Sequence, residues 1–592
     1  MRPNSRESDP AMSSEPKGGA GKPVTWMSLP HKPQLFILAI CRLSEPLSNT
    51  CLLPYLYYLI RSLHTTDDET PSPAKISRQA GVLVSLFALS QFATSVPWAS
   101  FANHFGRKTT IVIGIVLSII SNVGFGFSTS IPAVMFWRIL AGLGNGNIGV
   151  MRTMTAEIVK ERKYQSRAFL LLPLIFNAGV VIGLFLGGCL AQPVINIPSL
   201  FGPEGAWNFS KDPEGVAWMR AYPFALPTLF NAGVLMISLF FAVFGLKETM
   251  PGMEDNKDWG LVIGDTMLRI FKRVFMKSNP TGYAVLDTDD RAESEVGLLE
   301  SMPSTPGTPF PKPPQPEIQE IKRAPAPRPK LSIFSKEIYT REVLYTFLSF
   351  AILPLHNSAF MQLFPVFLST PPSSTPSYSA IKFNGGLGLA SPTIGVFLSS
   401  FGIFGILIQL FIYPSLQAWL GTLRSYRVAL AIFPFAYILA PYICLIPSSN
   451  FGFQAVAIAF ILFLQVTGRT FGIPSTVILL TNSAPTPLAL GAVHGVGNML
   501  SSLARTVGPL LGGYIFGWGI EHGAIGMVWW SYLTTIAVVG LGWSWMLTEG
   551  EHPASKGKGV KKEGRIEEGS KDEAIELVPK NEENEKGSGG GR

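Results

Sequence analysis

The sequence contains little charge and few cysteines. Only 15% of its 592 residues are Asp, Glu, Lys or Arg, whereas soluble chains carry about a quarter, so an ordinary soluble protein is disfavoured. The four cysteines, Cys41, Cys51, Cys189 and Cys444, lie in apolar segments without disulfide or zinc-site spacing, where we expect buried thiols. No apolar run follows a basic stretch at the N-terminus, so we expect no cleavable signal peptide.

Motifs for several kinds of chemistry are also missing. The sequence has no G-x-x-x-x-G-K-[ST] run, which disfavours ATP hydrolysis. It shows no constellation of nucleophile and base and no cluster of His, Cys and acidic residues with metal-site spacing. We therefore expect no enzyme, no cofactor and no bound metal. The net charge of +8 is concentrated in loops and tails, which does not describe a nucleic-acid surface.

Long apolar runs are abundant instead, and 47% of the residues are hydrophobic. Twelve runs reach about 20 residues, the length that crosses some 30 Å of hydrocarbon. In lipid, such a segment satisfies its backbone groups as a helix. We therefore predict an all-α membrane protein with twelve transmembrane helices in two six-helix halves, embedded in the lipid bilayer. The predicted spans are residues 34–60, 80–101, 110–128, 132–154, 168–191, 223–246, 341–369, 393–416, 428–446, 454–478, 488–517 and 525–547.

The distribution of apolar runs divides the chain into five regions. Residues 34–246 hold the first six spans and residues 341–547 the other six. The segment between them, 247–340, is polar and rich in proline, a composition that cannot bury a core, so we expect a largely disordered linker. The tails, 1–33 and 548–592, are polar and are expected to be disordered too.

Basic residues predict the orientation in the membrane. Lys and Arg are concentrated in the short loops after spans two, four and eight, and such loops face the cytoplasm by the positive-inside rule. Both termini and the linker are therefore predicted to be cytoplasmic. The glycosylation sequon at Asn208 falls in a loop on the opposite side, which agrees with this orientation. Plasma and vacuolar membranes both fit the pattern.

Several local motifs resemble those of one transporter family. Residues 98–108 read WASFANHFGRK and resemble the Gly-x-x-x-Asp-Arg-x-Gly-Arg-Lys loop of the major facilitator superfamily. From Arg138, span four reads RILAGLGNGN, similar to the buried-arginine motif of proton-coupled members. Spans five and eleven contain GLFLGG and GPLLGG, which resemble the Gly-Pro-x-x-Gly-Gly element of antiporters. The corresponding residues are Gly183, Gly187, Gly188, Gly508, Pro509, Gly512 and Gly513, whose small side chains let helices approach closely.

With the Glu45-Pro46 pair and the RTFG run from Arg469, the chain looks like a fungal drug:proton antiporter close to the zinc-induced-facilitator-like group. The resemblance covers residues 34–250 and 340–547. It implies a transporter that binds a small organic solute between its two halves and alternates between inward- and outward-open states.

The loop motif departs from the family pattern. The resemblance implies a gating role for Asn103, Gly106, Arg107 and Lys108. Asn103 stands where the family has Asp, and because Asn carries no charge we expect a weaker latch at the inward gate. Leu184 replaces the proline of span five, so we expect that helix to be straighter.

Glu45 is the only acidic residue well inside a predicted span, and Arg42 lies one helical turn before it. Charged groups at this depth cost about 2.5–3.5 kcal/mol and usually serve a pathway. We predict that Glu45 is the proton-coupling carboxylate and that Arg42 and Arg138 support it. A purely structural ion pair between Arg42 and Glu45 and a snorkelling Arg138 are the alternatives.

Four further residues are candidates for the cavity between the halves: Asn145, His356, Arg469 and His494. Histidine titrates near neutrality and can take part in a proton relay, although a hydrogen-bonded structural histidine is the alternative for both positions. We predict a monomeric secondary transporter of a small organic solute that works by proton-coupled efflux. A non-transporting membrane sensor on the same fold is the alternative, because the loop motif is altered and the polar segments are long.

Overall fold

The computed structural model describes residues 28–64, 71–159, 162–250, 252–253, 258–275, 336–373, 379, 381–486 and 489–550. Over these residues the chain is helical apart from its loops and an isolated β-bridge between Pro372 and Gly385. Nine helices of the described part are long and apolar enough to cross a membrane. The expected all-α membrane fold is confirmed. The predicted tails, outside 28–33 and 548–550, and most of the linker lie beyond the described residues.

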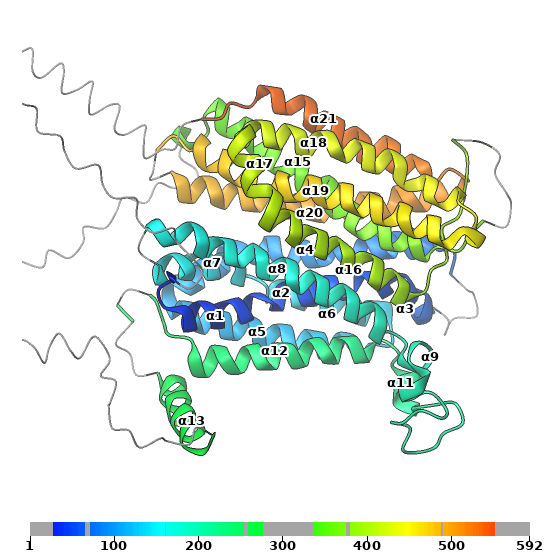
Figure 1. Ribbon diagram of the computed structural model, residues 1–592, viewed down its shortest axis with the longest axis horizontal. Helices are drawn as coiled ribbons and strands as arrows, with labels where there is room; N and C mark the ends of the chain where they lie inside the picture. Colours follow the sequence, from blue (N-terminus) through cyan, green and yellow to red (C-terminus); the bar gives the residue numbers. More distant parts are fainter. Residues whose placement is uncertain are drawn as a thin grey trace, which may run out of the picture.

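The N-terminal half occupies the lower part of Figure 1, coloured from blue to green. Its spanning helices are α1 (Lys32–Arg42), α2 (Ser44–Thr50) and α3 (Leu56–His64) for the first span, then α4 (Pro73–Phe105), α5 (Arg107–Gly126), α6 (Ile131–Leu143) with α7 (Asn147–Ile158), α8 (Arg162–Leu190) and α12 (Ala225–Gly245). The loop before α12 holds the short helices α9 (Pro193–Asn196), α10 (Pro198–Phe201) and α11 (Ala217–Ala221).

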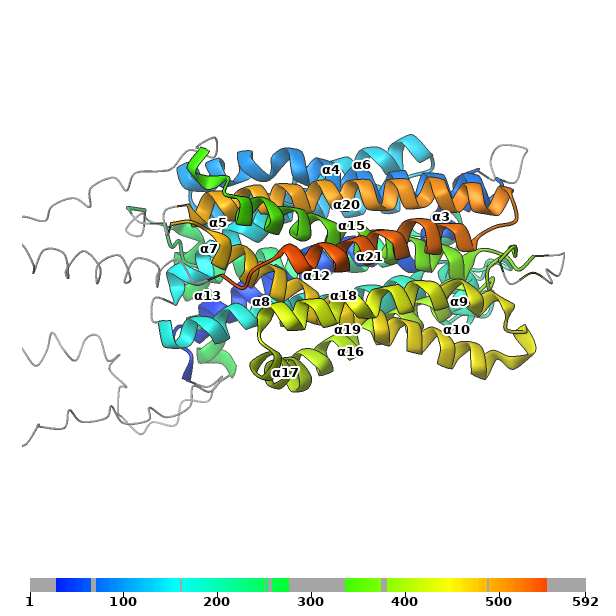
Figure 2. The same ribbon diagram turned by 90° about the horizontal axis from the view of Figure 1, so that it is seen from above.

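The C-terminal half lies above it in Figure 1, coloured from green to orange-red. Its helices are α15 (Arg341–Ser369), α16 (Ser391–Leu407) with the π-helix η4 (Ile408–Ile412) and α17 (Tyr413–Leu420), α18 (Thr422–Leu439), α19 (Phe451–Ser483), α20 (Leu490–Glu521), and the π-helix η7 (Val528–Thr534) with α21 (Thr535–Trp543). Figure 2 shows that the helices of both halves run along one common direction. The predicted spans outside the nine correspond to α6–α7, α20 and η7–α21.

Capping residues fix where two of the long helices, α4 and α15, begin. Pro73 opens α4, and the Ser72 hydroxyl before it accepts a hydrogen bond from the Lys75 backbone N–H at 3.3 Å. The Thr340 hydroxyl caps α15 in the same way, accepting from the Val343 N–H at 3.3 Å. Both arrangements satisfy backbone donors that the first helical turn leaves unpaired.

The fourth span is broken in the middle. Trp98 of α4 packs against Gly146, where a β-carbon would clash with the indole ring, and its Nε1 donates to the Leu143 carbonyl at 2.6 Å. The indole ring thus fills the space beside Gly146, and its N–H takes the Leu143 carbonyl that would accept a backbone hydrogen bond in a continuous helix. Residues Gly144–Gly146 separate α6 from α7 as a result.

The two halves meet closely at one end of the bundle. We call the end that holds Gly106 the turn end, and the opposite end the far end; they lie at the left and the right of Figure 1. At the far end, Gly81 of α4 faces Gly513 of α20 so closely that a β-carbon on either would meet the other's backbone. Gly188 of α8 and Gly395 of α16 form a second such contact. These glycines let helices of opposite halves touch backbone to backbone.

Polar contacts and a hydrophobic core also join the two halves at the far end, whereas the cores are separate toward the turn end. At the far end Arg78 of α4 pairs with Glu521 of α20 at 2.6 Å, and Tyr58 donates to the Leu389 carbonyl at 2.5 Å. One core joins both halves there, with members such as Ile60, Leu184, Phe367 and Ile394. Toward the turn end each half has a core of its own, exemplified by Cys41, Ala102 and Met154 in one half and by Val343, Phe350 and Leu480 in the other. The conformation is therefore closed at the far end.

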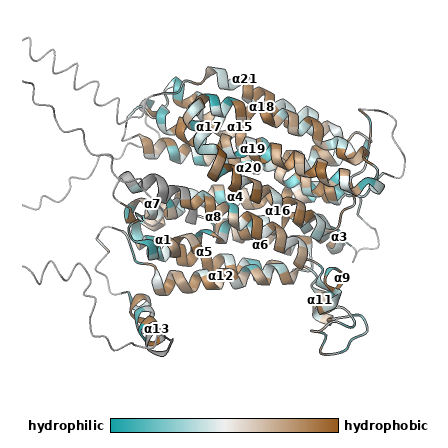
Figure 3. Cartoon of the chain, viewed as in Figure 1, coloured by the Kyte–Doolittle hydropathy of each residue, from teal (hydrophilic) through white to brown (hydrophobic). Residues whose placement is uncertain are grey.

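The described part of the segment predicted as a largely disordered linker includes an α-helix that the prediction did not include, α13 (Trp259–Phe275). It lies beside the end of α12 and runs crosswise to the bundle (Figure 1). Figure 3 shows hydrophobic residues on it and along the outer face of α12. The overall polarity of the linker hid its 17-residue amphipathic pattern, because composition averages over position.

Candidate functional site

Arg42 and Glu45 lie where the first span changes from α1 to α2. Arg42 closes α1 and Glu45 stands in the first turn of α2, so both side chains project from one face. The Arg42 guanidinium donates to the Glu45 carboxylate in a buried ion pair, and the two residues are 8% and 7% exposed. Glu45 is the only buried Asp or Glu among the described residues. A role for either residue in proton coupling remains a prediction.

Phe176 of α8 connects this pair to the other half. The Arg42 guanidinium carbon lies 5.2 Å from the centre of the Phe176 ring, and that of Arg469 of α19 lies 5.6 Å from the same ring. Arg469 also lies over Phe401 of α16 at 5.2 Å. Each contact is a cation–π interaction. Side chains of both halves therefore meet around one phenyl ring near the middle of the spans.

Two more arginines, Arg152 and Arg505, lie near the Arg42–Glu45 pair. We call Arg42, Glu45, Arg152 and Arg505 the central ionic group; Arg469 adjoins it across Phe176. Arg152 of α7 and Arg505 of α20 interact electrostatically with Arg42 and Glu45. Arg505 donates to the Ser502 hydroxyl at 3.0 Å, and its buried Nε has no partner among the described residues. Guanidinium groups outnumber the single carboxylate, so the group carries excess positive charge.

Arg138 lies beside this group rather than in it. It is 4% exposed, donates to the Asn49 side-chain oxygen at 3.1 Å and to the Ser48 carbonyl at 3.4 Å, and stacks over Phe87 at 4.7 Å. These contacts fix the first span against α6 and α4. Support of Glu45 by Arg138 would therefore act through the backbone of α2, and it remains a prediction.

The other cavity candidates have different surroundings. His356 is fully buried, its Nδ1 lies 2.7 Å from the Tyr437 hydroxyl, and its ring packs on Phe433 at 4.7 Å. His494 lies 3.0 Å from the Thr481 hydroxyl and interacts electrostatically with Arg152. The Asn145 carbonyl accepts a hydrogen bond from the Gln91 side chain at 3.1 Å. Arg469 and His494 thus adjoin the central ionic group, whereas His356 belongs to an aromatic cluster. Their roles remain predictions.

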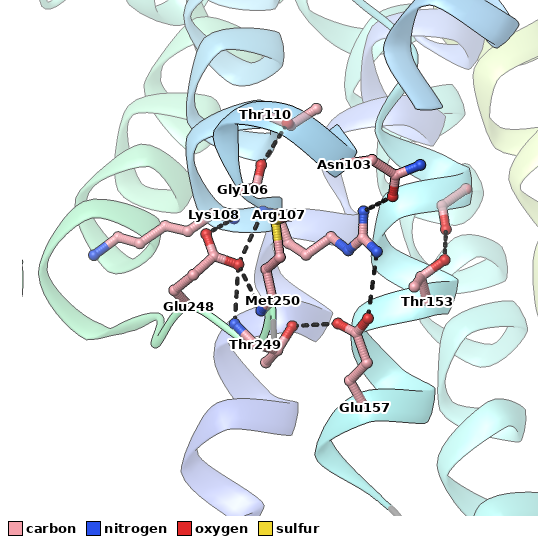
Figure 4. Close-up of polar contacts among 11 residues, drawn as sticks. Asn103, Gly106, Arg107, Lys108, Thr110, Thr153, Glu157, Glu248, Thr249 and Met250 are labelled. Carbon is pink, nitrogen blue, oxygen red and sulfur yellow. Dashed lines mark hydrogen bonds and ion pairs between the residues drawn. The ribbon is translucent and has the colours of Figure 1, made fainter. Parts of the chain in front are cut away.

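The turn between α4 and α5 brings the predicted gating residues together (Figure 4). Gly106 has φ of 97°, and a β-carbon there would clash with the Glu248 carboxylate, so both backbone and space require glycine. Glu248 accepts hydrogen bonds from the backbone N–H groups of Arg107 at 2.9 Å and Lys108 at 3.0 Å. It thereby caps the first turn of α5 from the end of the sixth span.

Side chains extend this turn into a network. Arg107 donates to the Asn103 side-chain oxygen at 2.6 Å and forms an ion pair with Glu157 of α7 at 3.4 Å. Lys108 forms an ion pair with Asp258 at 2.5 Å. The partners Glu157, Glu248 and Asp258 were not predicted from the sequence. Glu248 lies in the run LKET at residues 246–249, directly after the predicted sixth span.

The C-terminal half repeats the cap. Gly421 has φ of 76° between α17 and α18, and Glu549, which follows the twelfth span, accepts from the Thr422 N–H at 2.9 Å. Both caps share a sequence signal. In each half, a glycine precedes the third span and a glutamate follows the sixth span of that half.

The glycine motifs divide between two kinds of contact. Gly188 and Gly513 lie in the interface between halves described above. The remaining members pack within one half. Gly183 and Gly187 meet Thr50 and Cys51 in the middle of the first span, and Gly508 and Gly512 meet α15. Pro509 lies inside α20, and its carbonyl is the atom that a β-carbon on Gly81 would meet first.

Comparison with known proteins decides the family. The family model described as Major Facilitator Superfamily matches residues 38–371. The chain belongs to this superfamily. A multidrug transporter of the superfamily from Aspergillus fumigatus, mfsB, is 32% identical over 524 residues, covering 86% of this chain and 82% of the relative. The protein ZINC INDUCED FACILITATOR 1 of Arabidopsis thaliana is 24% identical, covering 82% and 84%.

Solved structures agree on the fold. A POT family transporter in complex with 5-aminolevulinic acid has a TM-score of 0.53 at 13% identity, covering 88% of this chain and 96% of that one. A D-xylose-proton symporter has a TM-score of 0.51 at 12% identity, covering 88% and 98%. The expected family is confirmed, and the chain is a multi-pass integral membrane protein and a secondary transporter of a small molecule, not an enzyme.

The predicted glycosylation residue, Asn208, is 7% exposed. Its amide nitrogen, the atom that glycosylation would modify, donates to the carbonyls of Pro203 at 2.9 Å and Asp212 at 2.8 Å. Modification would require this loop to open, and it remains a prediction. No cluster of three or more metal-ligating side chains occurs in the described ranges.

Proposed function

We propose that this member of the superfamily couples the movement of an organic solute to protons and exports the solute by alternating access. One observation carries the proposal: the buried Arg42–Glu45 pair lies on Phe176, and Arg469 of the other half lies on the same ring. A titratable carboxylate at the junction of two moving halves can make their relative position depend on its proton. Protonation of Glu45 would remove the charge that Arg42 pairs with and leave both groups free to change partners.

The contacts between the halves support the alternating movement. The far end is closed by Arg78–Glu521 and by the contacts of Gly81 with Gly513 and of Gly188 with Gly395. To expose the centre at the far end, these contacts must separate while the halves approach each other at the turn end. With both termini in the cytoplasm, as we propose, the present conformation is the one that faces the cytoplasm.

The charge of the central ionic group favours a second coupling mode for anionic solutes. Guanidinium groups exceed carboxylates there, and protonation of Glu45 adds further positive charge. An anion would therefore bind best together with a proton, whereas a cation would compete with the proton for the same site. Exchange for protons is thus the proposed mode for a cationic or neutral solute, and joint movement with protons is the second mode, for an anion.

A growth screen followed by vesicle transport tests the proposal. A strain lacking the protein and the same strain expressing it are compared on a panel of drugs, metals and organic acids. A solute that changes growth is then followed in vesicles with a pH gradient and an internal pH dye. Wild-type protein should concentrate the solute, and the direction of proton movement separates the two modes. Vesicles that move none of the solutes would support the sensor alternative.

A further inference from the structure

Helix α13 has two clearly separated faces. When its 17 residues are arranged at 100° per residue, all but one of the apolar and glycine residues fall on one side. The polar side holds Asp265, Thr266, Arg269, Lys272 and Arg273, interrupted only by Val262. Three of these five are basic. Such a helix is typical of the boundary between water and lipid.

The apolar side is largely uncovered. Trp259, Ile263 and Ile270 are 74%, 48% and 57% exposed. Met267 and Leu268 are 47% and 51% exposed. Between these two on the helical wheel lie Gly260 and Gly264, whose close neighbours are the Val243 and Phe244 carbonyls of α12. The helix therefore approaches the bundle most closely at its two glycines and leaves large apolar side chains about half exposed or more. Exposed apolar side chains gathered on one helix face mark an interaction surface.

The position of α13 identifies what covers this surface. α12 crosses the bilayer, so its end lies at the membrane boundary, and α13 starts beside that end and runs crosswise to α12, away from the side of the bundle (Figure 1). The surroundings of a membrane protein at that level and on that side are lipid. Figure 3 shows hydrophobic colour on the helix, and its basic residues match the charge of anionic headgroups.

Asp258 fastens the start of α13 to the gating turn. Its Oδ1 accepts hydrogen bonds from the backbone N–H groups of Gly260 at 2.9 Å and Leu261 at 3.3 Å, which caps the helix. Its Oδ2 accepts from Lys108 Nζ at 2.5 Å. One carboxylate thus holds both the helix and the residue whose backbone N–H Glu248 caps. A shift of α13 changes the position of the partner of Lys108.

We propose that α13 lies in the membrane interface and binds anionic lipid headgroups through its basic side, which includes Arg269. We further propose that the position of α13 in the membrane affects the gating turn through the contact of Asp258 with Lys108. The lipid surface is then a regulator of this transporter, separate from the solute and the proton. The inference concerns binding at α13 and can be tested whether or not the proposed proton coupling holds.

Depth quenching tests the membrane contact. Met267→Cys, in full-length protein without the four native cysteines, is labelled with an environment-sensitive dye and placed in phosphatidylcholine vesicles with or without phosphatidylglycerol. We expect strong quenching by lipids spin-labelled near the headgroup, increased by phosphatidylglycerol. Ile270→Asp should lower the quenching about twofold or more, because a carboxylate on the apolar side opposes immersion. The matched variant Thr266→Asp, on the polar side, should change it little.

Three outcomes would overturn the membrane contact. They are quenching by aqueous iodide rather than by lipid, protection from both quenchers (which would mean that protein covers the helix), and equal effects of Ile270→Asp and Thr266→Asp. Quenching that does not respond to phosphatidylglycerol, or that responds equally in Arg269→Gln, would overturn the binding of anionic headgroups.

The labelling rate of a cysteine in the gating turn tests whether α13 affects that turn. His104→Cys in the same background, exposed next to Asn103, is reacted with a water-soluble maleimide in both vesicle types. We expect the labelling rate to depend on phosphatidylglycerol, and Asp258→Asn to remove that dependence. Asp265→Asn, a carboxylate of α13 with no contact to Lys108 in the described structure, should leave it intact. A dependence that survives Asp258→Asn, or that wild type never shows, would overturn the coupling.

Discussion

The turn between α4 and α5 and the turn between α17 and α18 are built around the same cap and differ in what surrounds it. Both place a glycine with positive φ before the next helix, and both use a glutamate that follows the last span of their half. The resemblance between the halves therefore includes a specific backbone contact as well as the helix count. The cap joins the third span of each half to its last span.

Charge distinguishes the two turns. In the N-terminal half Arg107 contacts Asn103 and Glu157, and Lys108 contacts Asp258. In the C-terminal half the two residues after Gly421 are Thr422 and Leu423, which carry no charge. The interiors differ in the same sense, because one half holds the Arg42–Glu45 pair and the other holds His356 within an aromatic cluster. The cap is therefore common to both halves, whereas the ionic contacts that can switch belong mainly to the first half.

The largest effect should come from removing the carboxylate of that half. Glu45→Gln keeps the size of the side chain but cannot bind and release a proton, so we expect uphill transport under a pH gradient to be abolished while solute still equilibrates. His356→Gln, in the aromatic cluster, should retain uphill transport. Vesicle accumulation of a solute from the growth screen measures both. Accumulation by the Glu45 variant, or equal loss in both variants, would remove the distinction between the halves.

The next effect should come from Arg138, because its guanidinium makes two hydrogen bonds and a ring contact with three different residues. Lysine cannot offer the planar fork, so Arg138→Lys should lower transport strongly while the protein still reaches the membrane. Arg427→Lys is the matched control. Among the described residues Arg427 makes one hydrogen bond, to the Ser544 carbonyl at 3.3 Å, and lies over Trp545. Normal transport by Arg138→Lys would leave it the role of a snorkelling residue.

The two caps should differ measurably in stability. Glu248 accepts from two helical N–H groups and Glu549 from one. Hydrogen bonds to a charged group contribute about 1.5–3 kcal/mol each, and Gln in place of Glu weakens them by losing the charge. We therefore expect Glu248→Gln to lower the thermal unfolding midpoint in detergent more than Glu549→Gln does. An equal or reversed order would mean that the caps are not the shared element of the halves.

The sequence was sufficient for the family, the spans and the Arg42–Glu45 pairing, because those follow from apolar run length and local spacing. It was insufficient to predict the interaction of Arg152 with Glu45, because Arg152 lies near the end of span four, where an arginine at the membrane interface is common. Asp258 could not be assigned either, since its contact with Lys108 joins residues 150 positions apart. Helix α13 was hidden by the polar composition around it. Long-range pairing and short amphipathic segments are what composition and motifs leave open.

The smallest effect should come from Asn103→Asp, which restores the charge that the family motif has at this position. The family resemblance alone predicts slower labelling of a cysteine on the turn side of the cavity, because the charged latch would form only when the turn end closes. In the structure, however, the Asn103 oxygen already accepts from Arg107 at 2.6 Å while the far end is the closed end. Asp would strengthen that contact too.

Only the difference in contact energy between the two states shifts their equilibrium. An ion pair between residues four apart contributes about 0.3–0.5 kcal/mol. Because Asn103 already contacts Arg107 in the state closed at the far end, part of this stabilisation by Asn103→Asp would be present in both states. We therefore expect the labelling rate of the cysteine to change by about twofold or less, measured in a background without the native cysteines. His104→Asp, one position further along the same turn, is the control for added charge alone. A tenfold slowing specific to Asn103→Asp would mean that the new carboxylate finds its partner only in the state closed at the turn end, and that Arg107 changes partners during the transport cycle.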